Sequence, residues 1–180
     1  MTVKLDAVDE TGGSGVATVV YVIDGGDPVT ARGATTDAVI AVDALSHEDD
    51  GVHTLAYMAT DAAGNTEPQK TLTVNIDTQR PTTRAPWSAW VRRGHRVTLR
   101  FRVTEAAPTC GIESIVVKIS DRRGRVVKTL KRVARLSGHT YGQRFHCSLR
   151  KGDYRFTVYA RDGADNRQAA ARSNWLHVRR

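Results

Sequence analysis

The sequence predicts an all-β protein built from two tandem β-sandwiches. Three features support this prediction: a duplicated segment, a period-two alternation of apolar and polar residues, and turn signals every 8–15 residues. The duplication runs without a gap, because residues from Gly51 to Asn65 match those from Gly152 to Asn166 at a constant offset of 101. A repeat of this length indicates two units of one design, and short strands at this spacing indicate sandwiches or barrels.

The individual strands follow from the alternation, since successive side chains of a strand point to opposite faces. Between Arg96 and Val103, for example, every second residue is apolar and the residues between them are polar or basic. No window predicts a helix. The expected strands lie near residues 2–8, 16–23, 29–32, 37–42, 52–60 and 70–76, and then near 96–104, 112–120, 125–134, 141–149, 153–161 and 173–179.

The boundary between the two units is expected in a polar stretch from Asp77 to Thr83 that contains Pro81. We therefore expect an acidic sandwich over residues 1–78, a linker over 79–83 and a basic sandwich over 84–180. Residues 1–80 hold 4 Lys/Arg and 13 Asp/Glu, whereas residues 81–180 hold 23 Lys/Arg and 6 Asp/Glu. This asymmetry suggests different partners for the two units, or it reflects the arginine-rich composition of a GC-rich genome.

The start of the chain shows no basic leader followed by an apolar core, so no signal peptide is expected. The longest apolar run, Val16 to Ile23, is too short to span a bilayer. Because the first expected strand begins at residue 2, we expect a fragment of a longer protein in which Met1 is an expression start.

Several short motifs carry a family resemblance. They are Ser14-Gly15-Val16, Asp61-Ala62-Ala63-Gly64-Asn65, Ile76-Asp77-Thr78, Gly152-Asp153-Tyr154 and Asp162-Gly163-Ala164-Asp165-Asn166. With these motifs, both units resemble the immunoglobulin-like repeats of bacterial surface and secreted proteins. The stretch from Ile119 to Leu130 is also similar to a hairpin in the immunoglobulin-like domains related to flagellar hook-capping proteins. The resemblance implies two immunoglobulin-like β-sandwiches that serve as stalks, spacers or adhesive modules, in an extracellular or cell-surface location.

The two cysteines, Cys110 and Cys147, are expected to form a disulfide. Export, which the resemblance implies, would place them in an oxidising compartment, where such pairs usually form. Cys147 shares a strand face with Phe145, which we expect to point inward, and Cys110 directly precedes the strand that begins at Ile112. Two buried thiols that are not bonded to each other are the alternative.

Two weaker candidate sites involve calcium and sugars. Asp9, Asp61 and Asn65 could converge at one end of the first unit, with Asp77 at the domain junction, and oxygen ligands of this kind suit Ca²⁺. Turn capping is the alternative role for these residues. The tryptophans Trp87, Trp90 and Trp175 form either an aromatic platform for sugars or a packing cluster in the core or at the junction.

Catalysis has no support in the sequence. It contains no Gly-x-Ser-x-Gly motif, no His-Glu-x-x-His motif and no glycine loop between a strand and a helix. We therefore expect a protein that is not an enzyme and that uses no cofactor, with calcium as the possible exception.

The basic residues of the second unit suggest a polyanion-binding surface. Arg96, Arg100 and Arg102 lie on the outward face of one expected strand, and Arg155 and Arg161 lie on that of another. These strands form one broad basic surface only if they share a sheet, and the alternation leaves their pairing open. Such a surface attracts teichoic acid, acidic polysaccharide or nucleic acid without sequence preference, or it docks the acidic first unit of a neighbouring molecule.

The function expected from these features is that of a non-catalytic structural or adhesive module pair in an exported bacterial surface protein. It would act as a spacer or as a binding module. The alternative is a carbohydrate- or cell-wall-polymer-binding accessory module of a secreted enzyme. The expected partners are an acidic cell-wall polymer or polysaccharide and other domains of the same protein. No specific nucleic-acid recognition is expected, because no recognition motif is present.

Overall fold

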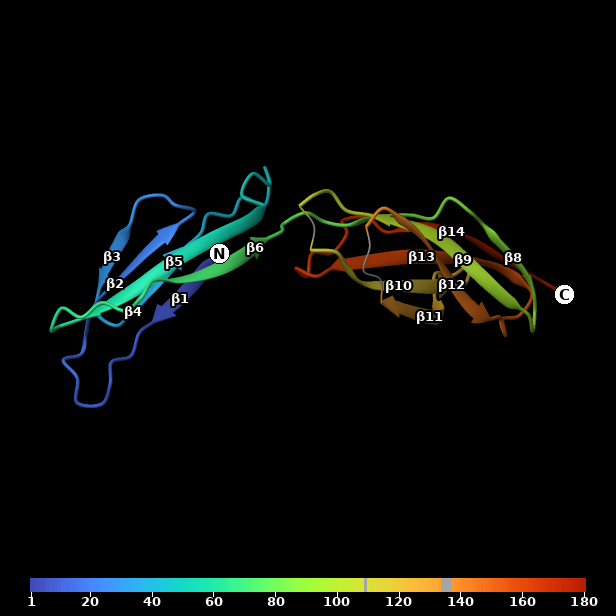
Figure 1. The fold of residues 1–180 in the computed structure, drawn as a ribbon. Helices are drawn as coiled ribbons and strands as arrows, with labels where there is room; N and C mark the ends of the chain where they lie inside the picture. Colours follow the sequence, from blue (N-terminus) through green and yellow to red (C-terminus); the bar gives the residue numbers. More distant parts are fainter. Residues whose placement is uncertain (109, 134–136) are drawn as a thin grey trace. The chain divides into compact units, whose positions relative to one another are not determined.

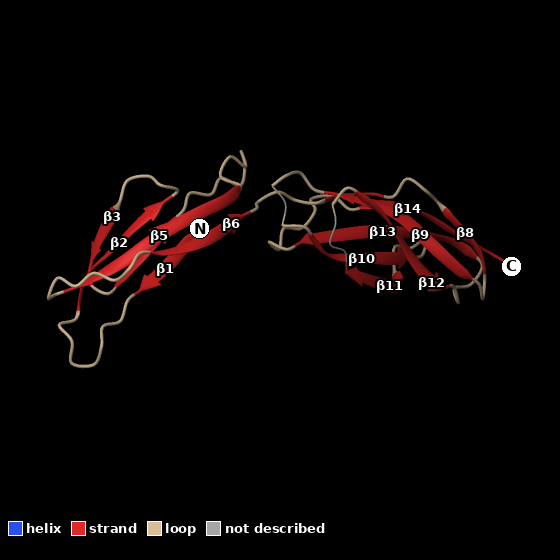
Figure 2. Cartoon of the chain, in the orientation of Figure 1, coloured by secondary structure: helices blue, strands red, loops and turns tan. Residues whose placement is uncertain are grey.

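A computed structural model describes residues 1–108, 110–133 and 137–180 (Figure 1). In these ranges the backbone forms strands and loops with no helix, which confirms the all-β prediction (Figure 2). Accordingly, no helix suited to crossing a membrane is found among them. The chain divides into two compact units, Met1–Asp77 and Thr78–Arg180, which we call unit 1 and unit 2. That each unit folds independently stays a prediction.

Unit 1 consists of a four-stranded and a two-stranded antiparallel sheet. The larger sheet has the order β3-β2-β5-β6, and the smaller sheet pairs β1 with β4. The core between them is small and is built from residues such as Leu5, Val19 and Leu55. The strands are β1 (Thr2–Asp6), β2 (Val16–Ile23), β3 (Val29–Arg32), β4 (Thr35–Val39), β5 (Gly51–Asp61) and β6 (Lys70–Ile76).

Unit 2 consists of a five-stranded sheet and a three-stranded sheet. Their orders are β11-β10-β13-β14-β8 and β12-β9-β7. All pairings are antiparallel except that of β14 with β8. Two mainly antiparallel sheets with connections that cross between them are the architecture of an immunoglobulin-like sandwich. The strands are β7 (Thr82–Arg84), β8 (Ala89–Arg92), β9 (Arg96–Thr104), β10 (Ile112–Ser120), β11 (Val126–Val133), β12 (His139–His146), β13 (Gly152–Asp162) and β14 (Arg172–Arg179).

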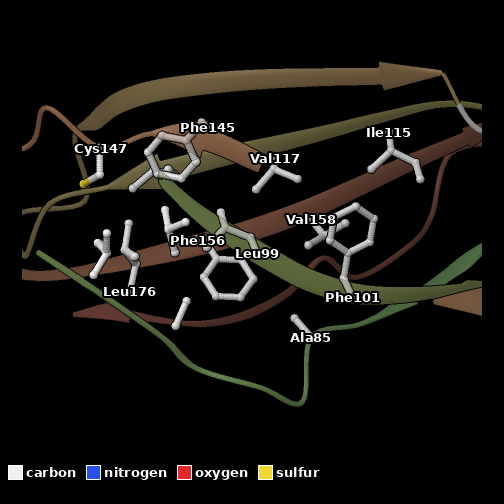
Figure 3. Close-up of a cluster of buried hydrophobic side chains, with 14 of the residues drawn as sticks. Ala85, Leu99, Phe101, Ile115, Val117, Phe145, Cys147, Phe156, Val158 and Leu176 are labelled. Carbon is white, nitrogen blue, oxygen red and sulfur yellow. The ribbon is translucent and has the colours of Figure 1, made fainter. Parts of the chain in front are cut away.

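The core of unit 2 lies between its two sheets and contains the inward half of each alternating strand (Figure 3). Leu99 and Phe101 of β9 are fully buried against Phe156 and Val158 of β13. Burial of one side of β9 leaves its other side in solvent, as the alternation predicts. The inward positions therefore determine which arginines face outward.

The duplicated segment forms the same hairpin in both units. The amide of Asn65 donates to Asp61 Oδ1 at 2.8 Å, and the amide of Asn166 donates to Asp162 Oδ1 at 2.7 Å. Each aspartate thus holds the turn between the last two strands of its unit, by accepting an amide hydrogen bond from four residues further on. The repeated Asp and Asn residues therefore stabilise a turn, as expected from turn chemistry.

The expected strands occur close to their predicted positions, but the structure adds two strands that the alternation did not predict. These are β7 and β8, which are only 3 and 4 residues long. Residues 82 and 83, expected in the linker, belong to β7 and pair with β9. The expected strand 125–134 ends at residue 134, which lies outside the described residues.

Candidate functional site

The most distinctive surface of unit 2 is the outer face of its three-stranded sheet. Because Val97, Leu99, Phe101 and Val103 point into the core, the residues between them on β9 point outward. Neighbouring strands add Arg84 from β7 and Arg144 from β12. We call this surface the arginine face, and it comprises five exposed residues: Arg84, Arg96, Arg100, Arg102 and Arg144.

The register brings these arginines together across the strands. Arg84 lies opposite Arg102, whereas Arg100 lies opposite Gly142. Since Gly142 has no side chain, a shallow hollow of about 580 Å³ opens there, lined by Thr98, Arg100 and Arg144 among others. A Cβ at position 142 would lie only 2.8 Å from Thr98 Cγ2, so a larger residue there would have to displace the Thr98 side chain. The hollow offers guanidinium groups from two strands to one anionic group.

In the part of the chain that the structure describes, no carboxylate forms an ion pair with the arginine face. The carboxylates of unit 2 serve other arginines instead, since Asp153 binds Arg122 and Arg179, and Asp121 binds Arg125. Like charges opposite each other on neighbouring strands are destabilising, so this arrangement lowers the stability of unit 2 and favours an anionic partner.

Arg155 and Arg161 do not join this surface. Both lie on β13, which belongs to the five-stranded sheet, so they do not share a sheet with the arginines of β9, and the two groups lie on opposite outer faces of the sandwich. Arg155 lies 5.1 Å from the ring centroid of Trp175, and Arg161 pairs with Asp165 at 2.9 Å. The alternation did identify Arg96, Arg100 and Arg102 as outward residues of one strand.

Sequence reasoning missed two members of the arginine face. Arg84 lies just after the expected linker, in a strand too short to be recognised by its periodicity. Arg144 could have been found, because it alternates with Gln143 and Phe145 inside an expected strand. The signal was present there, but it gains meaning only once β12 is known to pair with β9.

The tryptophans lie outside the core of unit 2. Trp90, Trp87 and Trp175 are 62%, 47% and 41% exposed. Trp90 on β8 lies opposite His177 on β14 and stacks on its ring at a centroid distance of 4.0 Å. Trp175 lies on the same outer face, two residues before His177. Both rings already contact cationic groups, since Arg179 lies 4.8 Å from the Trp90 centroid.

A charged network borders these aromatic residues. Asp153 accepts hydrogen bonds from His177 at 2.8 Å, from Arg122 at 2.8 Å and from Arg179 at 3.1 Å. These donors hold the pKa of Asp153 well below its ordinary value, with the bond from His177 as the largest cause. The network therefore holds His177 and Arg179, which contact the Trp90 ring, in position.

The residues expected to bind calcium are only partly brought together. Asp9, Asp61 and Asn65 line one open cleft of about 560 Å³ in unit 1. Asp77 follows β6 at its Ile76 end, where Ile76 pairs with Gly51, whereas Asp61 lies at the other end of β5. Ten residues of strand separate these ends by about 33 Å. Both carboxylate oxygens of Asp61 accept hydrogen bonds from Asn65, so calcium coordination by this group stays a prediction.

The expected disulfide between Cys110 and Cys147 is wrong, because no bond joins them. The Cys110 sulfur accepts a hydrogen bond from the Ala164 amide at 3.1 Å, beyond the end of β13. Cys147 is buried beside the start of β9, where its amide bonds to the His95 carbonyl. The length of a nine-residue strand, about 27 Å, lies between these two ends, and a disulfide needs Cα atoms within about 7 Å.

No family model and no curated protein matches this sequence. Among solved structures, the chain is similar to the fibronectin(III)-like modules of CbhA from Clostridium thermocellum, with 14% identity over 99% of this chain and 85% of that one, and a TM-score of 0.49. A DUF3823 family protein from Bacteroides ovatus matches with 13% identity over 98% of both chains and a TM-score of 0.44. A tetra-tandem repeat in the extending region of a large adhesion protein matches with 20% identity over 91% of this chain and 41% of that one, and a TM-score of 0.41. None of these solved structures is a flagellar hook-capping protein.

Proposed function

We propose that this chain is a non-catalytic adhesive module pair of an exported surface protein, in which unit 2 binds an acidic polymer through the arginine face. The observation that carries the proposal is the group of five exposed arginines on one sheet face, none of which has a carboxylate partner in the described ranges. A surface of this kind retains charge that an anionic ligand can neutralise.

The geometry favours an extended polymer over a small anion. Arg100 and Arg102 are two residues apart on one strand, so their side chains repeat at about 6.6 Å along the same face. Arg84 and Arg144 continue the surface on both neighbouring strands. Repeated anionic groups of a uronic-acid polysaccharide or a teichoic acid can contact such a surface at several points, and each contact adds to the others.

Binding to an immobilised polyanion tests this proposal on the full chain. The triple variant Arg84→Gln, Arg100→Gln, Arg102→Gln should elute from a heparin column at lower salt than the parent. A matched control with the same loss of charge is Arg93→Gln, Arg123→Gln, Lys151→Gln, since these exposed residues lie outside the arginine face. The control should elute close to the parent. Equal shifts for both variants would mean that net charge alone causes retention.

A second candidate function is sugar recognition by the exposed tryptophans. The specific observation in its favour is that Trp90 and Trp175 lie on one outer face of the five-stranded sheet. Against it, Arg179, His177 and Arg155 already contact these rings. A neutral glycan array should distinguish the two functions, because loss of binding in Trp90→Ala and Trp175→Ala, with no effect of the arginine triple, would favour the sugar site. Binding to neither kind of polymer would leave a spacer role.

A further inference from the structure

The six strands of unit 1 have counterparts in unit 2, and unit 2 has two more strands. β1 to β6 correspond in order to β9 to β14, and their pairings agree: β1 with β4 as β9 with β12, and β3-β2-β5-β6 as β11-β10-β13-β14. The remaining strands, β7 and β8, pair with β9 and β14. Among the described residues, unit 1 has no strands that correspond to β7 and β8. The edges of β1 and β6 that correspond to the edges of β9 and β14 covered by β7 and β8 therefore pair with no strand.

In unit 2 the segment from Pro81 to Val91 closes the sandwich. Its inward residues are small or apolar and are buried, while the residues between them within each strand are exposed. β7 runs antiparallel to β9, and β8 then runs parallel to β14. Two further hydrogen bonds hold it, from Thr83 Oγ1 to the Val158 carbonyl at 3.3 Å and from Asn174 Nδ2 to the Ala85 carbonyl at 2.7 Å. The buried positions are Pro81, Thr83, Ala85, Ala89 and Val91.

The space that β7 fills in unit 2 is an open cleft in unit 1. The cleft of about 560 Å³ is lined by residues 5–9 and, across from them, by Tyr57, Glu67 and Lys70. The offset of 96 between Gly15 and Gly111 makes residues 6–8 the counterparts of 102–104, which are the partners of β7. Tyr57 is the counterpart of Val158, whose carbonyl accepts the bond from Thr83. The cleft therefore lies at the position of the missing strand.

Apolar side chains line this cleft, and others beside it are in contact with solvent. Leu5 and Val19 in the lining are buried and Val16 is half-buried, whereas Leu72 on β6, outside the lining, is 41% exposed. Leu72 pairs with Leu55 across the strands, and Asn174 pairs with Phe156 in the same way, so Leu72 and Asn174 occupy corresponding positions. In unit 2, Asn174 donates a hydrogen bond to the Ala85 carbonyl. Only 7 hydrophobic residues are buried in unit 1, against 18 in the described part of unit 2. Unit 1 thus has a sandwich core that is open on one side.

The backbone of β1 is also ready to accept a strand. The Ala7 amide donates to the Ala34 carbonyl at 2.8 Å, so the odd-numbered residues of this strand bond toward β4. The amides of Asp6 and Val8 consequently point to the other edge. An edge of this kind is a template for pairing with an additional strand.

We propose that unit 1 is a strand acceptor, which binds an extended polypeptide segment from outside residues 1–180. The segment has small or apolar residues at alternate positions, as residues 81–91 have. It pairs antiparallel with β1 at residues 6–8 and then parallel with β6 near residues 74–77. A second copy of this chain is a poor donor, because its own residues 81–91 already cover the core of its unit 2. The proposal does not depend on the arginine face.

A synthetic peptide with the sequence of residues 80–92 is the probe, added to the full chain. Hydrogen–deuterium exchange should slow over residues 5–9 and 70–77, and the melting temperature of unit 1 should rise with peptide concentration. The control peptide carries Asp at the positions of Ala85, Ala89 and Val91, and it should give neither effect. Equal protection by both peptides, or protection by neither, would overturn the proposal unless the covalent test below succeeds.

The covalent test fuses residues 79–96 directly before Met1 of the full chain, which raises the effective concentration of the segment. This fusion should protect the same residues and stabilise unit 1. Val8→Pro should abolish protection in both tests, since it removes an amide from the free edge while the Val8 side chain is 91% exposed. Val8→Ala should retain it. Failure of the fusion, or concentration-dependent dimers of the parent that protect residues 5–9, would show that the proposal is wrong.

Discussion

Arg84 on β7 lies directly opposite Arg102 on β9, and both side chains are exposed on the outer face of the same sheet. Like charges in this position repel each other, so Arg102→Thr should stabilise unit 2 by about 0.2–1 kcal/mol at low ionic strength. The gain should shrink in 1 M salt, where charges are screened within about 3 Å. Urea unfolding at both salt concentrations measures this, and a gain that is independent of salt would contradict the electrostatic account.

The stability of unit 1 should depend on pH through His53 and Asp24. His53 Nδ1 lies 2.7 Å from Asp24 Oδ2, and His53 Nε2 lies 2.8 Å from the Asp49 carbonyl, so both ring nitrogens donate only in the protonated form. The bond to Asp24 raises the pKa of His53. Bonds from the Thr54 amide and then from His53 lower the pKa of Asp24.

Both signs follow from these directions. A raised histidine pKa contributes stability that is present below about pH 6.5 and is lost as the pH rises through the folded pKa. A lowered aspartate pKa contributes stability that is present above about pH 3.9 and is lost as the pH falls. Unit 1 should therefore lose stability above about pH 6.5, and His53→Gln should flatten this loss. Thermal melts from pH 4 to 8 test it, with His139→Gln as the control.

Two thiols should react in the denatured protein without prior reduction, because Cys110 and Cys147 lie at opposite ends of unit 2. In the folded protein, a thiol reagent should modify the exposed Cys110 first and the buried Cys147 only as unit 2 opens. Cys110→Ser should remove the fast phase alone. An absence of reactive thiols in the denatured, unreduced protein would indicate a disulfide after all.

Asp165 has a left-handed backbone with φ of 68°, whereas its counterpart in the repeat, Gly64, has φ of 90°. A side chain in this conformation costs about 1–2 kcal/mol, which glycine avoids. Asp165→Gly should therefore be more stable than Asp165→Ala by about 1 kcal/mol, since both variants lose the ion pair with Arg161 equally. Chemical denaturation of the two variants measures the difference, and equal stabilities would refute the strain.

Leu55 and Phe156 occupy equivalent positions in the repeat, and both are fully buried. Phe156→Ala should cost about 3–5 kcal/mol and Leu55→Ala about 2–5 kcal/mol. If the units fold independently, each variant lowers only the transition of its own unit in a calorimetric scan. A single transition that moves with both variants would show that the units unfold together.

The local parts of this fold could be predicted from the sequence because they depend on neighbouring residues. Alternation located strands such as 96–104 and 112–120 at their observed limits, since a strand needs only one apolar and one polar side. The short strands β7 and β8 were missed because three or four residues give little periodicity. Of the candidate site, Arg96, Arg100 and Arg102 were recognised, whereas Arg84 and Arg144 needed the pairing of three strands.

The sequence by itself determined the all-β class, the repeated hairpin and the outward direction of each strand's polar residues, because these follow from the two-residue period and from turn chemistry. Only the tertiary structure decided which strands share a sheet. It placed Arg155 on the opposite side from Arg100, set Cys110 and Cys147 at different ends, and showed no counterpart of β7 and β8 among the described residues of unit 1. The physical reason is that strand pairing joins residues far apart in the chain, and the backbone hydrogen bonds that join strands are similar for every pair, so periodicity alone does not select the partner.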